Sequence, residues 1–389
     1  MTSEQPAPGP GIAEWIESYY DQQSEGEWQR LDSHRTEHAV TERALLEHLP
    51  SPPAKVLDCG GGPGRYSIAL AQRGYQVTLF DLSAQNLDLA RQQATAAGQT
   101  LFNYEQGTAT DLSRFAADSF DAVLLMGPLY HLLQDGERRQ ALAEAYRVLA
   151  PGGPLFAAFL TRYAVARFCA AREPLWPLEE PEMWVTVLDT GILPPRGAQA
   201  SAFVAYGAHP SEVPPLLAES GFELKSLLGV EGLVSMIEES VNALDGPAWE
   251  LWADLNYQLA SDPSLHGAVE HLLAVAVKPR WRAVLIKITR HLQAAGIPFK
   301  VVGGTAVALL GAPVPVNDID LELSASDVYR FQEIYAGHAL QPASLSVSET
   351  YRSHLGRYEL DGVQIEVMGV STGARETAGC PSPPRQKGL

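Results

Sequence analysis

The sequence predicts an α/β protein in which a large unit, built on a doubly wound parallel sheet, precedes a smaller α/β unit. Three observations predict it. Strand-like and helix-like segments alternate between residues 55 and 160, as in consecutive βαβ units. A glycine-rich loop follows the first predicted strand and opens a helix, and Asp81 ends the second strand. A second glycine pair and a second acidic strand lie in residues 303–320, after a break at residues 278 and 279.

Composition limits the kinds of protein that this chain can be. Its 389 residues suffice for two or three domains of roughly 100 to 200 residues each. The net charge of −18 argues against non-specific nucleic-acid binding, which needs a basic surface. The three cysteines show no metal-ligand spacing, and no apolar run reaches the roughly 18 residues of a membrane span. We therefore expect a cytoplasmic protein with neither a membrane nor a nucleic acid as its partner.

The pattern along the chain divides it into five segments. We expect residues 1–11 to be a disordered leader and residues 371–389 a disordered tail, because proline, glycine and small polar residues dominate both. Residues 12–279 form the large unit and residues 280–370 the second unit. Within the large unit, residues 162–200 break the alternation with tryptophans and prolines. This segment is typical of a lid or a substrate-recognition insertion.

Each element of the large unit has a local signal. The stretch 12–49 is helical and rich in aromatic residues. Gly74 ends the predicted helix 64–73, Ser83 caps the helix 83–98, and Pro151 follows the helix 135–149. The stretch 120–126 is almost wholly apolar, as expected of a strand that is buried on both faces. The predicted strands are 55–59, 75–80, 101–106, 120–126, 155–160, 222–228 and 271–277. The other predicted helices are 64–73, 83–98, 135–149 and 210–220, with a further helical stretch before residue 271.

The second unit begins with an amphipathic helix at residues 281–295 and a strand at 299–302. A second strand is predicted at 318–323. The last two strands, 357–360 and 363–368, form a hairpin around the turn signal Asp361-Gly362.

The glycine loop of the large unit favours one of three ligand classes. Its pattern is an aspartate followed by alternating glycines: Asp58, Gly60, Gly62 and Gly64. A dinucleotide fingerprint needs a further glycine where Arg65 or Ser67 stands, and a phosphate-binding P-loop needs a lysine that is absent. An acid before the loop suits a cationic amino-acid ligand better than a pyrophosphate. Asp81, 23 residues after Asp58, can accept hydrogen bonds from two ribose hydroxyls.

These motifs make residues 12–279 similar to the class I S-adenosylmethionine-dependent methyltransferases, a Rossmann-like doubly wound family. The loop after Asp58 matches its first motif, Asp81 its ribose-binding acid, residues 120–126 its fourth strand, and residues 147–153 the turn before the fifth. One departure is Thr108, which stands where many relatives carry an adenine-binding acid. The resemblance implies methyl transfer from S-adenosylmethionine to a small-molecule acceptor. The cofactor-binding residues that it implies are Tyr19, Tyr20, Asp58, Gly60, Gly62, Gly64, Asp81, Leu82, Thr108, Ala109 and Met126.

Two roles stay open for the aromatic residues and for the histidine near this loop. Tyr19 and Tyr20 either cover the cofactor or are core aromatics of the N-terminal helix. His131, with Tyr130 beside it, is the catalytic candidate because it follows the fourth strand at the mouth of the pocket. Methyl transfer is an in-line displacement, to which positioning and water exclusion can contribute most of the rate. His131 is therefore either a base for an acceptor that must lose a proton or an orienting residue.

The second unit resembles the nucleotidyltransferase superfamily. Gly303, Gly304 and Thr305 would bind the nucleotide phosphates. Asp318 and Asp320 share one face of a strand, and Glu366 is the acid that the last strand offers. Three such carboxylates would hold Mg²⁺ on a nucleoside triphosphate. Two alternatives remain beside the methyltransferase hypothesis: Mg²⁺-dependent nucleotidyl transfer as the main activity, or a non-catalytic sensor that binds S-adenosylmethionine.

Overall fold

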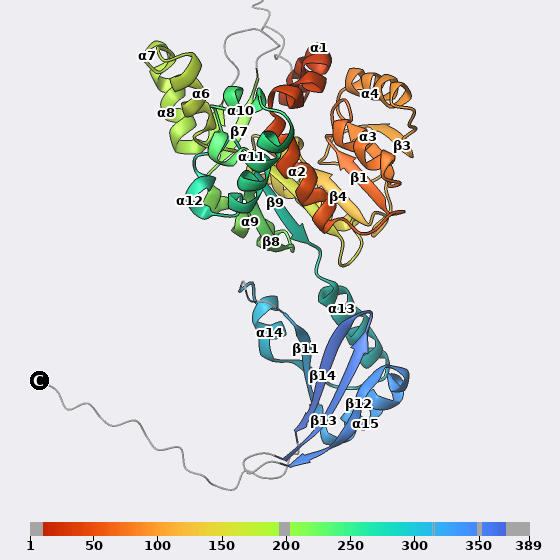
Figure 1. The fold of residues 1–389 in the computed structure, drawn as a ribbon. Coiled ribbons are helices and arrows are strands. Elements are labelled where there is room, and N and C mark those ends of the chain that lie inside the picture. Colours follow the sequence, from red (N-terminus) through yellow and green to blue (C-terminus); the bar gives the residue numbers. More distant parts are fainter. Residues whose placement is uncertain (1–10, 194–202, 313, 315, 348–351, 371–389) are drawn as a thin grey trace, which may run out of the picture. The chain divides into compact units, whose positions relative to one another are not determined.

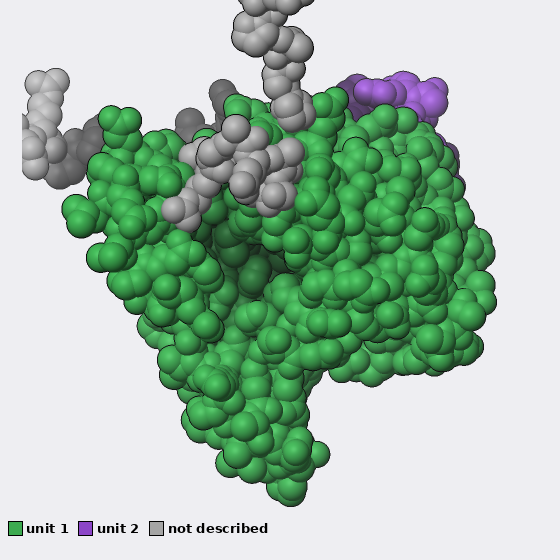
Figure 2. Space-filling model, turned by 90° about the horizontal axis from the view of Figure 1, so that it is seen from above, with its two compact units in different colours: residues 1–279 green, residues 280–389 purple. Residues whose placement is uncertain are grey.

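The structure, a computed structural model, describes residues 11–193, 203–312, 314, 316–347 and 352–370. The predicted tail, the predicted leader apart from Gly11, and the end of the predicted 162–200 insertion lie outside the described residues. The chain forms two compact units, unit 1 (residues 1–279) and unit 2 (residues 280–389), which Figure 2 colours separately. Each has its own hydrophobic core.

Unit 1 is built on a doubly wound sheet, as the sequence predicts. Its strands are β1 Lys55–Cys59, β2 Gln76–Asp81, β3 Asn103–Gln106, β4 Ala122–Leu125, β5 Pro154–Thr161, β6 Ile192–Leu193, β7 Ala205–Ala208, β8 Glu223–Gly229 and β9 His271–Val277. The central order β3-β2-β1-β4-β5 is parallel throughout (Figure 1). Every residue of β4 and β5 is buried, because helices cover both faces of a doubly wound sheet. The crossover helices are α3 Arg65–Gln72, α4 Ala84–Ala96 and α5 Asp135–Val148.

The prediction of a wholly parallel sheet is wrong at one edge. β9 runs antiparallel to β5, and β8 runs antiparallel to β9, while β7 is parallel to the end of β5. A run of buried apolar residues specifies a strand but not its direction, which depends on how the connecting helices return the chain. Between β8 and β9 the chain passes through η3 Gly232–Val234, α10 Glu239–Asn242, α11 Gly246–Leu259 and α12 Pro263–His266.

Two long helices precede the sheet, α1 Ile12–Ser33 and α2 Arg35–His48. α1 packs against α2 and α4, so residues of α1 reach the loop that follows β1. Among the described residues, no helix combines the length and the apolar character that crossing a bilayer requires.

The predicted insertion is mostly helical. It contains α6 Ala164–Arg172, α7 Trp176–Glu179 and α8 Pro181–Thr190, which Figure 1 shows grouped at one end of unit 1. Its strand β6 pairs with β7 and so belongs to the edge of the sheet, which the sequence analysis did not expect. The 3₁₀ turns η1 Pro128–Tyr130 and η2 Pro210–Glu212 and the helix α9 Val213–Glu219 complete the unit.

Unit 2 is a five-stranded sheet with the order β10-β11-β14-β13-β12. Its strands are β10 Lys300–Val301, β11 Asp318–Ser324, β12 Ala339–Val347, β13 Arg352–Leu360 and β14 Val363–Val370; its helices are α13 Arg280–Ala294, α14 Gly303–Leu309 and α15 Ala325–Ile334, with the turn η4 Ala336–His338. The hairpin around Asp361-Gly362 forms as predicted, and β11 lies parallel to β14. The sequence analysis did not identify α15 or β12.

Candidate functional site

The loop between β1 and α3 brings the main chain close to a cavity. Gly60, Gly62 and Gly64 have φ values of 73°, 56° and 84°, in the left-handed region that favours glycine. A Cβ on Gly60 would overlap Pro128, whereas one on Gly62 would meet nothing nearer than 3.9 Å. The backbone of Gly62 is therefore open on its outer side, where a ligand can approach it. Gly64 is buried and caps α3, so it shapes the turn and does not line the cavity.

Asp81, at the end of β2, is held by three N–H donors. Its carboxylate accepts hydrogen bonds from the backbone N–H of Gly62 (2.8 Å), the backbone N–H of Ser83 (2.9 Å) and Nδ2 of Asn86 (3.2 Å). Burial raises the pKa of Asp81 above its ordinary value, although these donors oppose the shift. Oδ1 accepts two of the bonds and Oδ2 one, so Oδ2 keeps a lone pair for a ligand hydroxyl.

Asn86 is a site residue that the sequence analysis missed. Its side chain is buried on the first turn of α4, which Ser83 caps, and it reaches back to Asp81. An amide on the buried face of a helix, directly after the acid of β2, was the available signal.

Asp58 is a buried carboxylate with one hydrogen-bond donor. Ser67 Oγ donates to Asp58 Oδ2 at 2.7 Å, and burial raises the pKa of Asp58 to about 6. Ser67 stands where a dinucleotide-binding fingerprint would have a glycine. Here its hydroxyl orients Asp58, the acid before the loop. A buried carboxylate that accepts so few hydrogen bonds is stabilised by a cationic group beside it.

The residues predicted to bind the cofactor come together with two exceptions. The first cavity, of about 200 Å³, is lined by the glycine loop and by Tyr20, Asp58, Asp81, Leu82, Asn86, Thr108, Ala109, Met126, Tyr130 and His131. Gly64 and Tyr19 do not line it. The cavity combines the open main chain of the glycine loop with two acids: Asp81, which suits ribose hydroxyls, and Asp58, which suits an ammonium group. These residues fit S-adenosylmethionine, whose adenosine and amino-acid moieties need such partners.

His131 is neutral and has both ring nitrogens occupied. The carbonyl oxygen of Val204 lies 2.8 Å from Nδ1 of His131 and can only accept a hydrogen bond. Nδ1 of His131 is therefore protonated and donates to this oxygen. Nε2 therefore accepts a hydrogen bond from the hydroxyl of Tyr20 at 2.5 Å. Burial lowers the pKa of His131 to about 4. A weakly basic, fully bonded imidazole is suited to orienting Tyr20 and poorly suited to accepting a proton from a substrate.

A second cavity, of about 480 Å³, adjoins the first. Tyr20, Glu27, Arg30 and Tyr130 line both cavities, so these four side chains lie where the two meet. Tyr19 lines the second cavity only, as do residues of α6, α7 and β6 from the predicted insertion. The space-filling view in Figure 2 shows unit 1 hollowed on the face that it presents.

Glu27 and Arg30 were not predicted from the sequence. Tyr20, Glu27 and Leu31 follow one another at helical spacing on the same face of α1, next to the buried Ile16. An acid on the apolar face of a helix was the signal that could have identified Glu27.

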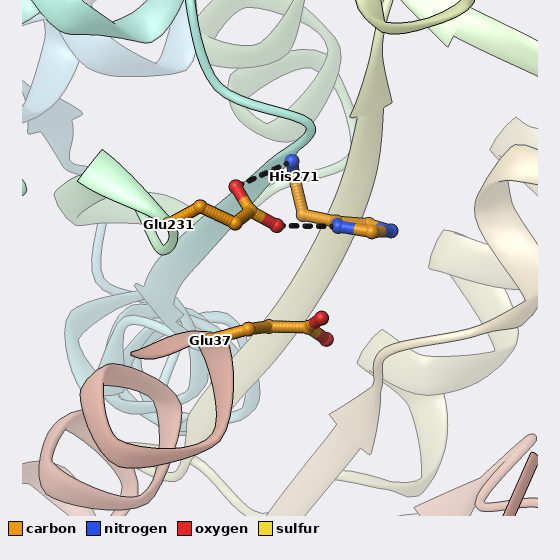
Figure 3. Close-up of side chains that lie close together, drawn as sticks. All are labelled: Glu37, Glu231 and His271. Atoms are coloured by element: carbon orange, nitrogen blue, oxygen red, sulfur yellow. Dashed lines mark hydrogen bonds and ion pairs between the residues drawn. The ribbon is translucent and has the colours of Figure 1, made fainter. Parts of the chain in front are cut away.

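Next to the second cavity, Glu37, Glu231 and His271 bring ligand-type atoms within 4.8 Å of one another (Figure 3). Glu231 accepts hydrogen bonds from Nδ1 of His271 (2.7 Å) and from its backbone N–H (3.0 Å). Arg30 donates two hydrogen bonds, at 2.6 and 2.7 Å, to the Glu37 carboxylate. Burial opposes protonation of His271, but Glu37 and Glu231 prevail and raise its pKa to about 9. With Arg30 and protonated His271 the group is already neutral, so these residues form an ion-pair network and do not fit a metal centre.

In unit 2, the predicted phosphate-binding and acidic residues lie near one another. Gly303 has φ of 61°, and a Cβ on it would overlap the carboxylate of Asp320. Thr305, fully buried, donates to the carbonyl oxygen of Asp318 at 2.8 Å and so ties α14 to β11. Gly304 follows Gly303 at the start of α14, and its backbone N–H donates to Asp320.

The three acids of unit 2 share one face of the sheet. Asp320 lies opposite Glu366 in the β11–β14 register, and Ile319 on the other face is buried, as the alternation predicts. Burial, Asp318 and Glu366 together raise the pKa of Asp320. Arg357 donates to Glu366 at 2.9 Å, and over the described residues these three acids do not bring their oxygens within 4.8 Å of one another. Asp318 and Asp320 therefore fit a divalent cation by charge and position, while Glu366 is held by Arg357.

Two family models match the chain. Residues 56–153 match the methyltransferase domain, and residues 284–381 match the aminoglycoside-2''-adenylyltransferase family. The first match runs from β1 to the turn before β5 and includes the glycine loop and Asp81. The second spans α13 to β14 and continues beyond the described residues.

Individual relatives resemble part of unit 1. The chain is 34% identical over 139 residues to the tRNA 5-carboxymethoxyuridine methyltransferase of Escherichia coli K12, over 36% of this chain and 48% of that protein. It is 40% identical over 114 residues to the demethylmenaquinone methyltransferase of Deinococcus radiodurans, over 29% of this chain and 45% of that one. The matches thus span less than half of these relatives.

Among solved structures, a protein of Methanosarcina mazei described as a SAM-dependent methyltransferase aligns with a TM-score of 0.42 and 20% identity. The alignment covers 61% of this chain and 97% of that one. The family models and the relatives show that the chain carries a class I S-adenosylmethionine-dependent methyltransferase domain at residues 56–153, followed at residues 284–381 by a region that matches the aminoglycoside-2''-adenylyltransferase family.

Proposed function

We propose that unit 1 transfers a methyl group from S-adenosylmethionine to a small-molecule acceptor in the second cavity. The observation that supports this most is the pairing of two cavities that share Tyr20, Glu27, Arg30 and Tyr130. One is lined by the residues of the methyltransferase motifs, and the other has the size of a small-molecule site.

Different residues of the first cavity would bind the ribose, the amino-acid moiety and the adenine of S-adenosylmethionine. Asp81 accepts from the ribose hydroxyls, its orientation fixed by Gly62, Ser83 and Asn86. Asp58, held by Ser67, faces the ammonium of the amino-acid moiety. Thr108 and Ala109, which follow β3, line the same cavity and would contact the adenine. When bound, S-adenosylmethionine supplies a methyl group already activated on a sulfonium.

The residues between the cavities position the reaction. Tyr20 and Tyr130 line the passage between donor and acceptor and exclude water from it. His131 fixes the hydroxyl of Tyr20 by accepting its hydrogen bond. In-line attack needs this alignment more than it needs a base, so we assign His131 the orienting role.

Calorimetry with S-adenosylhomocysteine tests the donor site. We expect one site per chain in the wild type and a loss of affinity of roughly two orders of magnitude in Asp81→Asn, which keeps the shape but removes the charge. Asp88→Asn is the matched control, because Asp88 lies exposed on the same α4 helix, where it pairs with Arg91. Absence of binding by the wild type, or equal binding by both variants, would refute the donor site. Tight binding without methyl transfer to any acceptor of a broad panel would instead support the sensor hypothesis.

The second unit supports a second candidate function: Mg²⁺-dependent transfer of a nucleotidyl group to an aminoglycoside. The match at residues 284–381 and the positions of Asp318 and Asp320 support this. These two carboxylates would hold the cation, and Gly303 and Gly304 would offer backbone to the phosphates of the nucleoside triphosphate.

Consumption of ATP in the presence of Mg²⁺ and kanamycin tests this function. We expect turnover that Asp318→Asn with Asp320→Asn abolishes. Glu333→Gln, at an exposed acid on α15, should leave it unchanged. Turnover that survives the double substitution would exclude unit 2 as its source.

A further inference from the structure

The charged side chains of the second cavity are unequally compensated. Each basic side chain on its wall has an acidic partner that does not line the cavity: Arg30 pairs with Glu37, His34 with Glu238 at 2.9 Å, and His271 with Glu231. The wall also carries the carboxylates of Glu27 and Glu270. The basic side chains are thus paired with acids behind the wall, and the wall itself adds the carboxylates of Glu27 and Glu270.

Glu27 and Glu270 are the two acids that this imbalance concerns most. Both are half-buried, and within the described part of the chain no hydrogen bond reaches either carboxylate. Glu27 lies 3.6 Å from Nε of Arg30, whose terminal nitrogens bind Glu37. Burial raises the pKa of Glu27 and of Glu270 above their ordinary values. A buried carboxylate without a donor is unfavourable until a ligand supplies one.

Aromatic rings make up much of the rest of the wall. Tyr19, Tyr130, Phe168 and Phe203 line the cavity, and Tyr19 and Phe203 pack edge to face. Aromatic faces combined with carboxylates are the usual environment for a cationic nitrogen, because the ring quadrupole attracts positive charge. The volume of about 480 Å³ suits a small molecule carrying one or more rings.

We infer that the second cavity binds a small molecule carrying ammonium groups, held between Glu27 and Glu270 against these rings. This inference rests on the proposed methyl transfer and specifies its acceptor as a cationic amine. Glu27 lines both cavities, so an amine bound to it lies beside the passage through which the methyl group moves. Glu27 and Glu270 are positioning residues for the acceptor.

Calorimetry on the full chain saturated with S-adenosylhomocysteine tests the inference with three ring compounds of similar shape. These are cis-1,3-diaminocyclohexane, cis-1,3-cyclohexanediol and cis-1,3-cyclohexanedicarboxylate, which differ in charge. We expect the diamine to bind and the other two compounds to give no heat of binding. Glu270→Gln and Glu27→Gln should each weaken diamine binding at least about tenfold. Glu25→Gln, at an exposed acid of α1, should change it less than about twofold.

The prior titration with S-adenosylhomocysteine separates this inference from the proposed function and shows that each variant is folded. If S-adenosylhomocysteine binds but the diamine does not, the amine inference fails while the donor site stands. Binding of the diol as tight as that of the diamine would overturn the inference, because charge would then play no part. Binding of the dicarboxylate instead would overturn it in favour of Arg30 and His271 as anion ligands. Equal diamine affinity in wild type, Glu270→Gln and Glu27→Gln would also overturn it.

Discussion

At the scale of single residues, hydrogen bonds from neighbouring groups fix the orientation of the side chains that line the candidate site. Asp81 is fixed by Asn86 and two backbone donors, Asp58 by Ser67, and Tyr20 by His131. Asp58 and Asp81 could be predicted because the glycine pattern and the end of a strand identify them. Ser67, Asn86 and Glu27 could not, since their roles arise from contacts that no local pattern encodes.

Asn86→Ala should weaken S-adenosylhomocysteine binding by about tenfold, because it removes one of three donors from Asp81 and lets the carboxylate turn. Calorimetry measures this directly. Gln85→Ala, at the exposed neighbour on α4, is the control and should bind as the wild type does. Equal affinities for the two variants would show that Asn86 has no part in positioning Asp81.

Tyr20→Phe should destabilise the protein by about 1 to 3 kcal/mol, because Nε2 of the buried His131 then lacks its hydrogen-bond donor. Urea unfolding followed by tryptophan fluorescence gives the free energy of unfolding. Tyr19→Phe is the matched control, since no described residue is hydrogen-bonded to the hydroxyl of Tyr19. A loss of stability no larger in Tyr20→Phe than in Tyr19→Phe would contradict the bonding of His131.

At the scale of elements, the ion-pair network joins parts of unit 1 that are distant in sequence. Arg30 belongs to α1, Glu37 to α2 and His271 to β9, and Glu231 precedes η3. The network therefore fixes the two N-terminal helices against the start of β9, beside the second cavity. Its stability contribution depends on the proton of His271.

This contribution should vary with pH in a definite direction. The pKa of His271 is about 9 in the folded protein and about 6.5 in an unfolded chain, so the folded state holds the proton more tightly. The stabilisation is full below pH of about 6.5 and is lost as the pH rises through about 9. Its upper size is about 3 kcal/mol.

Urea unfolding between pH 6 and 10 measures this loss. His271→Gln should show a smaller fall in the free energy of unfolding than the wild type over the same range. Parallel curves for the two proteins would mean that His271 is neutral in the folded state. A gain in stability on adding Zn²⁺ that EDTA reverses in the wild type and that is absent in His271→Gln would point to a metal centre instead.

Many strand and helix positions of unit 1 were predictable because these segments carry a local period or a breaker. β1 and β9 agree with their predicted bounds, and the caps at Ser83 and Gly64 mark real helix starts. The antiparallel direction of β8 and β9, and the joining of β6 to the sheet, depend on pairing between distant segments. The second cavity was not predictable for the same reason, since its wall comes from α1, α6, α7, β6 and β9.

At the scale of the whole molecule, net charge restricts the acceptor. The chain carries a charge of −18, whereas one relative acts, by its name, on a tRNA. Strong negative charge repels a polyanion and favours cationic small molecules near the protein. The same preference for cations follows independently from Glu27 and Glu270 in the second cavity.

The protein should not bind bulk tRNA at 150 mM salt with a dissociation constant tighter than about 10 μM. Filter binding with total bacterial tRNA, with and without S-adenosylhomocysteine, checks this. Saturable binding in the low micromolar range or below would indicate a basic groove that outweighs the net charge and a nucleic-acid acceptor.

A crystal structure of the protein with S-adenosylhomocysteine tests most directly whether unit 1 brings a methyl donor to the second cavity. We predict the ribose on Asp81, the amino-acid moiety near Asp58, and the sulfur at the boundary formed by Tyr20, Tyr130 and Glu27. The open side of the sulfur should face the second cavity. A ligand bound elsewhere, or a sulfur turned away from that boundary, would contradict the proposed methyl transfer.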